Sequence, residues 1–208
     1  MRPDRRLLLA GALAAIVAPA GGRAATGFGA VSAPIADLDV GLLAVMKAGQ
    51  TTPFPRRFTM LDPVIGRVFN LPRILSMVVG FDWPDIAAAQ RQKLLVVFRQ
   101  YTVASYVANF KSYNGQQFRI LPGLRAVGSE QVVTTEIVPQ NGSPTRIDYV
   151  MLPAGNSWQA TDVLLDGTIS QVAVQRSDFQ SVLASGGAPG LIDALQNKIR
   201  SLSGGTLS

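Results

Sequence analysis

Three aspartates, Asp148, Asp162 and Asp166, form the one local group of carboxylates whose spacing would suit acid–base chemistry. In such a pair, one carboxyl protonates a leaving group while the other activates water or acts as nucleophile. Asp166 precedes Gly167 in a predicted turn, where aspartate is common because its side chain bonds nearby backbone. We therefore interpret the three aspartates as structural residues.

The residue types of most other catalytic sites are missing from the sequence. Its 208 residues contain no histidine and no cysteine, which excludes Ser-His and Cys-His pairs, disulfides and zinc or iron–sulfur sites with those ligands. No lysine lies in a nucleophile motif, and there is no phosphate-binding glycine loop and no GxSxG or HExxH motif. We predict a protein with no enzymatic activity, no cofactor and no metal. A serine-dependent, esterase-like enzyme is the disfavoured alternative.

Residues 1–24 have the pattern of a secretory signal peptide, in which a basic start and an apolar run precede small residues. Arg5 and Arg6 come before the apolar run Leu7–Ala18, and Gly22 and Ala24 follow it. The run is too short to span a bilayer, which needs about 20 residues. We predict export by the ordinary secretory route or the twin-arginine route, with cleavage after Ala24. The remaining residues, 25–208, are expected to form a single domain.

The net charge of +6 overstates how basic the exported protein is. Removing the four arginines and one aspartate of the signal peptide from the 19 basic and 13 acidic residues leaves a net charge of +3. Nucleic acid is therefore not an expected partner. We predict a soluble secreted or periplasmic protein, and a monomer, because no coiled-coil seam is visible.

Apolar residues at helical spacing dominate the first half of the mature chain. We expect residues 25–33 to form a loose lead-in. The apolar spacing then predicts four helices: Pro34–Ala48, Met60–Phe69, Pro72–Val79 and the long Pro84–Tyr113. Pro63 and Pro72 are expected at helix starts.

Beyond Asn114 the pattern changes to that of a sheet. β-branched and aromatic residues between turn signals predict four strands, Gln117–Leu121, Gln131–Val138, Thr145–Leu152 and Trp158–Leu165. Their short connections favour an antiparallel meander. Helix returns at a capping box at Ser177–Gln180, breaks at Gly186–Gly190 and ends in an apolar stripe from Leu191 to Leu202. The fold class is α+β, with N-terminal helices and a long central helix packed on the four-stranded sheet.

The long helix is apolar on nearly every side, so it must be covered or must line an apolar cavity between helices and sheet. Core packing is the default interpretation for any single residue of this set. Arg56 and Arg57, next to Phe54 and Phe58, form a small basic–aromatic cluster. It suits either a solvated turn or a contact with anionic lipid headgroups.

Several strings, in order, resemble the MlaC-type periplasmic lipid-binding proteins, the toluene-tolerance auxiliary family. The match spans about Pro34 to Leu202. The first string is Phe81-Asp82-Trp83, then Gln92, Phe98, Tyr101 and Tyr106, and the second is Ile147-Asp148-Tyr149-Val150, then Trp158, Asp162-Val163, Asp166-Gly167, Ser170 and Arg176–Phe179. The third is Gly187, Leu191-Ile192 and Leu195. Tyr101–Phe110 and Asp162–Arg176 are most similar to the hopanoid-associated branch called HpnM. This chain departs from the family pattern by a shorter segment between Trp83 and Gln92 and by Gln175 where an aromatic is frequent.

The resemblance implies a soluble carrier that holds the acyl chains of a phospholipid or a hopanoid. It further implies movement between an outer-membrane lipoprotein complex and an inner-membrane ABC transporter with its lipid-binding subunit, which together maintain outer-membrane lipid asymmetry. From their convergence on the long helix and the sheet, we expect eight residues to contact the lipid tail: Phe98, Tyr101, Tyr106, Phe110, Tyr149, Met151, Val163 and Ile169. The alternative is an exported scaffold with a packed interior, which docks a membrane-associated, hopanoid-related enzyme complex.

Overall fold

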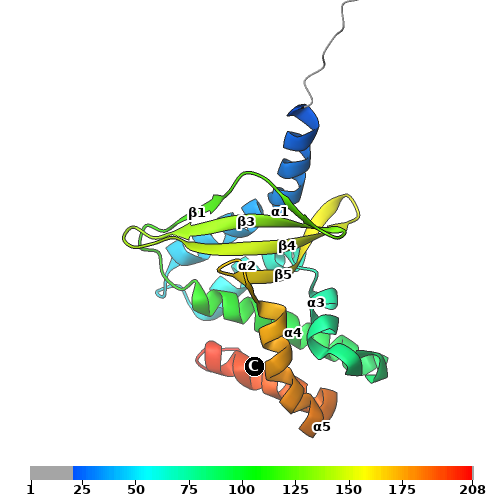
Figure 1. The fold of residues 1–208 in the computed structure, drawn as a ribbon. Helices are drawn as coiled ribbons and strands as arrows, with labels where there is room; N and C mark the ends of the chain where they lie inside the picture. Colours follow the sequence, from blue (N-terminus) through cyan, green and yellow to red (C-terminus); the bar gives the residue numbers. More distant parts are fainter. Residues whose placement is uncertain (1–20, 208) are drawn as a thin grey trace, which may run out of the picture.

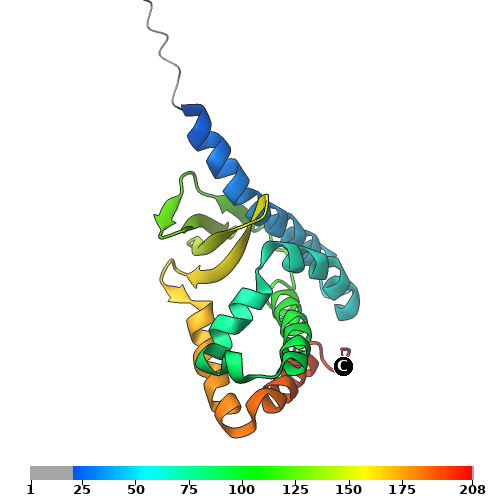
Figure 2. The ribbon, with the colours of Figure 1, turned by 90° about the vertical axis from the view of Figure 1, so that its right-hand side faces the viewer.

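The computed structural model describes residues 21–207, which fold into five α-helices, one short 3₁₀ helix and a six-stranded sheet. The predicted signal peptide lies outside these residues except for its last four. Helix α1 (Gly21–Ala48) runs along one face of the sheet, and α2 (Phe54–Val68) packs beside it. Helices α3 (Leu71–Val79), α4 (Ala88–Asn109) and α5 (Gln171–Leu202) gather below the sheet (Figures 1 and 2). The α+β class is confirmed.

The sheet is antiparallel, with strand order β1-β3-β4-β5-β6, and β2 pairs with β3 outside that path. Four of its strands overlap the predicted ones: β1 (Gln117–Ile120), β3 (Glu130–Val138), β4 (Thr145–Ala154) and β5 (Ser157–Leu165). The prediction of four strands missed β2 (Arg125–Val127) and β6 (Ile169–Ser170), which are too short to show a periodic pattern. In the β4–β5 register Val150 faces Asp162 and Met151 faces Ala160, so Thr161 is an extra residue in β5.

Helix α1 begins well before the predicted start at Pro34, so the expected loose lead-in at residues 25–33 is wrong. Ile35, Leu38 and Leu42 form its fully buried stripe. Among the described residues, Gly27–Ala48 is one segment long and apolar enough to cross a membrane by length and composition, with a mean hydropathy of 1.6. Its contacts with α2 and the sheet are those of a core helix.

Helix α2 also begins earlier than predicted. Phe54 and Pro55 occupy its first turn. This position suits proline, because the backbone N–H that proline lacks would have no helical partner there. Pro63 therefore lies inside the helix and does not start it. The following α3 starts as predicted, next to Pro72, with the Asn70 side chain accepting a hydrogen bond from the Arg73 N–H. The Asn70 N–H donates to the Ala160 carbonyl at 2.9 Å and ties this junction to β5.

The predicted long helix Pro84–Tyr113 is shorter in the structure. Pro84 belongs to the 3₁₀ turn η1 (Gly80–Asp85), and α4 runs only from Ala88 to Asn109. Ala87 has extended backbone angles that separate the two elements. The helix is also less apolar around its circumference than predicted, because Arg99 forms a bidentate ion pair with Asp62 of α2, at 2.7 and 2.8 Å.

Helix α5 starts at Gln171, six residues before the predicted capping box at Ser177. Its N-cap is Ser170, whose hydroxyl accepts a hydrogen bond from the Ala173 N–H. The predicted break at Gly186–Gly190 corresponds to a kink at Gly187 (φ 58°, ψ −157°), a region that is essentially restricted to glycine. The kink bends the C-terminal half of α5 back beneath α4 (Figure 2).

Candidate functional site

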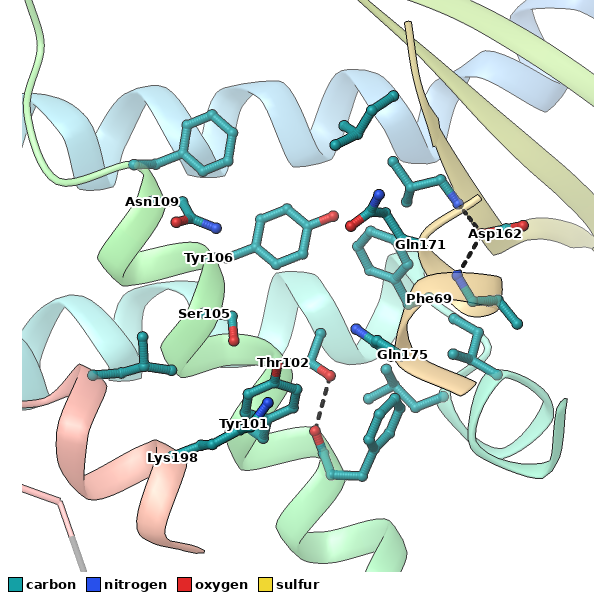
Figure 3. A pocket seen from close by; sticks show the side chains of 18 of the residues that line it. Phe69, Tyr101, Thr102, Ser105, Tyr106, Asn109, Asp162, Gln171, Gln175 and Lys198 are labelled. Atoms are coloured by element: carbon teal, nitrogen blue, oxygen red, sulfur yellow. Dashed lines mark hydrogen bonds between the residues drawn. The ribbon is translucent and has the colours of Figure 1, made fainter. Parts of the chain in front are cut away.

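A cavity of about 590 Å³ lies between α4, α5 and the sheet. Its walls come from the α2–α3 junction (Phe69, Leu71, Ile74), from one side of α4, from β4 and β5, and from both halves of α5. Figure 3 shows side chains from these elements pointing toward a common space. This volume falls within the range of roughly 300–1,000 Å³ that is usual for small-molecule sites.

Aromatic rings form much of the wall. Tyr106 on α4 lies between Phe69 and Phe110, with ring centroids 5.6 and 5.9 Å apart, and is nearly parallel to Phe110. Phe110 in turn lies 6.0 Å from Phe118 of β1. A second group joins Tyr101 to Phe98 and to Phe179 of α5, at 6.5 and 6.3 Å. These distances are favourable for aromatic pairs, so the wall holds its shape.

The structure brings together six of the eight residues that were expected to contact a lipid tail. Those that line the cavity are Phe98, Tyr101, Tyr106, Phe110, Tyr149 and Val163. Met151 does not line the cavity. It pairs with Ala160, beyond the extra residue Thr161, and its side chain is fully buried in the hydrophobic core. Ile169 in β6 does not line it either and is half exposed. Contact with a lipid stays a prediction for all eight.

The polar part of the lining was not predicted from the sequence. Thr102, Ser105 and Asn109 follow one face of α4 at spacings of three and four residues, and all three line the cavity. Gln171, Gln175, Lys198 and Ser201 of α5 complete the set. The three polar residues of α4 share a helical face, and that spacing is the signal which could have revealed them.

The three aspartates have structural contacts that account for them. Asp162 accepts hydrogen bonds from the Ser170 hydroxyl at 2.5 Å and from the Val172 N–H at 3.1 Å, and so holds the start of α5. Asp166 adopts a positive φ of 51° in the turn after β5. Asp148 lies on β4 and pairs with Arg146 through two hydrogen bonds of 2.9 and 2.8 Å.

The environment of Asp148 keeps its carboxylate ionised. Burial opposes ionisation, but hydrogen bonds from Arg146 and Thr134 outweigh it and hold the pKa of Asp148 below its usual value. Such a carboxylate is a poor proton donor or acceptor near neutral pH. The arrangement therefore gives no support to acid–base catalysis.

The interior beside the cavity contains a different acidic group. Asp39 on α1 is 8% exposed, and its Oδ1 has no hydrogen-bond partner. Burial raises the pKa of Asp39 to about 7. Burial, together with the nearby Tyr106 and Asp39, also raises the pKa of Tyr149 well above its usual value. Among residues 21–207 no cluster of three or more acidic side chains is arranged to hold a metal ion.

The two arginines of the basic–aromatic cluster beside Phe54 and Phe58 differ in the structure, because Arg56 is exposed and Arg57 is buried. Arg57 is 6% exposed, so it is neither in a solvated turn nor available to lipid headgroups. Its guanidinium lies 5.5 Å from the ring of Phe54 and donates hydrogen bonds to the Thr52 and Val107 carbonyls.

The sequence matches a known protein family, and the fold matches a solved structure. Residues 38–197 match the family described as MlaC protein. The fold is similar to that of a phospholipid-binding protein from Ralstonia solanacearum, solved in complex with a phospholipid, with a TM-score of 0.71. The two sequences are 21% identical, and the match covers 83% of this chain and 98% of the other.

Proposed function

The chain belongs to the MlaC family, and we propose that it is a periplasmic lipid carrier whose cavity holds the acyl part of a phospholipid. The observation that carries this proposal is the cavity of about 590 Å³, walled by aromatic and aliphatic side chains of α4, α5 and the sheet. The phospholipid-bound relative with the same fold supports the choice of ligand.

The physical basis of carriage is burial of hydrocarbon. Each CH₂ group removed from water contributes about 0.8 kcal/mol, so several buried methylenes hold a lipid without any covalent step. Six predicted tail contacts, among them Tyr106 and Val163, offer apolar surface for this purpose. Because such binding is tight, unloading requires a partner that competes for the lipid or opens the cavity.

The partners in this proposal are an outer-membrane lipoprotein complex on one side and an inner-membrane ABC transporter with its lipid-binding subunit on the other. The transporter would supply the energy, since this chain has no nucleotide-binding motif. The similarity of Tyr101–Phe110 and Asp162–Arg176 to the HpnM branch supports a hopanoid as the alternative cargo. A scaffold with a packed interior is not favoured, because it would not need a cavity of this size.

The test is native mass spectrometry of the mature protein purified from its own envelope, followed by organic extraction and identification of the lipid. We expect one phospholipid per chain. A hopanoid would preserve the carrier function and change the cargo. Folded protein that carries no lipid would contradict the proposal.

A pair of variants on α4 links the lipid to the cavity. Ser105→Trp introduces a large ring into the cavity, whereas Val96→Trp introduces the same ring on the exposed side of the same helix. We expect Ser105→Trp to lose most of the co-purified lipid and Val96→Trp to retain it. Equal lipid content in the two folded variants would place the lipid elsewhere.

A further inference from the structure

We propose that Lys198 on α5 binds the phosphate of the lipid headgroup at the rim of the cavity, and so selects phosphate-bearing lipids over neutral ones. This inference rests on the proposed function, because it concerns the headgroup of a lipid whose acyl part fills the cavity. Four lining residues are exposed and therefore form the rim: Asn109, Leu165, Lys198 and Ser201.

Only two of the described residues that line the cavity carry a formal charge, Asp162 and Lys198. The Asp162 carboxylate already accepts hydrogen bonds from the Val163 N–H, the Val172 N–H and the Ser170 hydroxyl. None of the ion pairs formed within residues 21–207 involves Lys198. The charge that remains for a ligand is therefore a single ammonium group.

Two aromatic rings fix the position of this ammonium. The Lys198 Nζ lies 5.8 Å from the ring centroid of Tyr101 and 5.9 Å from that of Phe179. Both distances are within the range of cation–π attraction. Because an ammonium group has three N–H donors, two ring contacts leave at least one donor for an anion. Figure 3 shows the Lys198 side chain extending from α5 toward Tyr101 on the side of the cavity that carries Ser105.

Neutral hydrogen-bonding groups line the same cavity. Ser201 lies three residues after Lys198 on α5, Ser105 comes from α4, and Gln175 comes from the first half of α5. Hydroxyl and amide groups of this kind donate to phosphate or ester oxygens. A cation among such donors, above an aromatic wall, matches an amphiphile with an anionic head and an apolar tail.

The test compares two lipids that differ only in the headgroup. Delipidated mature protein is mixed with equal amounts of phosphatidylglycerol and diacylglycerol with the same acyl chains, and native mass spectrometry gives the ratio of the two bound forms. We expect Lys198→Gln to lower the ratio of phosphatidylglycerol to diacylglycerol about two- to fivefold, the range for an exposed charge pair. Lys198→Arg retains the charge and should preserve the ratio.

Arg200→Gln is the matched control, since it removes one positive charge from the same helical turn. Arg200 bonds Asn197 and does not line the cavity, so its loss should leave the ratio unchanged. An unchanged ratio in Lys198→Gln, or an equal fall in Arg200→Gln, would overturn the assignment while both lipids still bind. Failure of folded wild-type protein to bind either lipid would instead contradict the proposed function.

Free phosphate is the other source of the same chemistry. Millimolar inorganic phosphate, compared with chloride at equal ionic strength, should leave the ratio of bound lipids unchanged. A phosphate adduct on the delipidated wild-type protein that Lys198→Gln removes, with no change in the ratio of bound lipids in that variant, would show that Lys198 holds a free anion and would overturn the headgroup assignment.

Discussion

Arg57 on α2 donates a hydrogen bond from its Nη1 to the carbonyl oxygen of Val107, near the C-terminal end of α4, over 3.3 Å. The same side chain donates from Nε to the Thr52 carbonyl at 3.1 Å. Carbonyls near the end of a helix lack helical partners, and a cation there interacts favourably with the helix dipole. Arg57 therefore joins α2 to the helix that carries most of the cavity wall.

Replacing Arg57 with methionine should lower the free energy of unfolding by about 2 kcal/mol, because one buried and one partly buried carbonyl lose a charged donor. Urea denaturation measures the change. Arg56→Met is the control, since the neighbouring Arg56 is exposed and its loss should change stability by less than about 0.5 kcal/mol. Equal midpoints for the two variants would show that the buried contacts of Arg57 contribute nothing.

Arg57 also shows why sequence patterns fail at tertiary contacts. Its partner Val107 lies 50 positions away in the chain, so no local pattern distinguishes it from the exposed Arg56. Local periodicity succeeded where burial alone decides the structure. The helical spacing of Ile35, Leu38 and Leu42 predicted the buried stripe of α1. The β-branched and aromatic residues between turn signals predicted most of β3, β4 and β5.

The ends of elements were predicted less well, because their stabilising partners are distant. The N-terminus of α5 depends on Asp162, eight residues before its cap at Ser170, whereas the predicted start rested on the more local pattern at Ser177. The candidate site shows the same division. Large apolar residues of α4 were predicted by their type. No local pattern marks Lys198, because its place at the cavity rim depends on the kink at Gly187.

Asp162→Ala should destabilise the protein by about 1–2 kcal/mol, since the Val172 N–H and the Ser170 hydroxyl lose their acceptor at the start of α5. Asp162→Asn keeps an acceptor oxygen and should cost less. Thermal unfolding of the three proteins measures the order. A loss in Asp162→Asn as large as that in Asp162→Ala would attribute the effect to charge and not to capping.

Gly187→Ala should destabilise the protein by about 1–3 kcal/mol, because alanine is strained at φ 58° and ψ −157°. Gly186→Ala provides a matched control at the adjacent position. A Cβ at Gly186 meets no atom within 4 Å, and its φ is not positive, so this change should be neutral or stabilising by up to about 1 kcal/mol. The denaturant midpoints of the two variants and the wild-type protein measure these effects. Equal effects at the two positions would show that the kink tolerates a side chain.

Asp39→Asn should stabilise the protein at pH 8 and have little effect at pH 4. In the folded state the pKa of Asp39 is raised to about 7, against 3.8 for an unperturbed carboxyl. Below pH 3.8 both states are protonated and burial carries no charge penalty. Between pH 3.8 and 7 the unfolded chain loses the proton while the folded protein keeps it, so wild-type stability falls as pH rises.

Above pH 7 Asp39 is ionised in both the folded and the unfolded protein, and the free-energy cost of burying its charge stays constant at about 2–4 kcal/mol. Asparagine has no charge to bury, so the stability difference between Asp39→Asn and wild type should rise from pH 4 to pH 7 and then level. Urea denaturation across this range measures it. Asp37→Asn, at an exposed position of the same helix, is the control and should change stability at pH 8 by less than about 0.5 kcal/mol. A difference that is flat with pH would mean that Asp39 titrates alike in the folded and unfolded states, and that Oδ1 is solvated despite its burial.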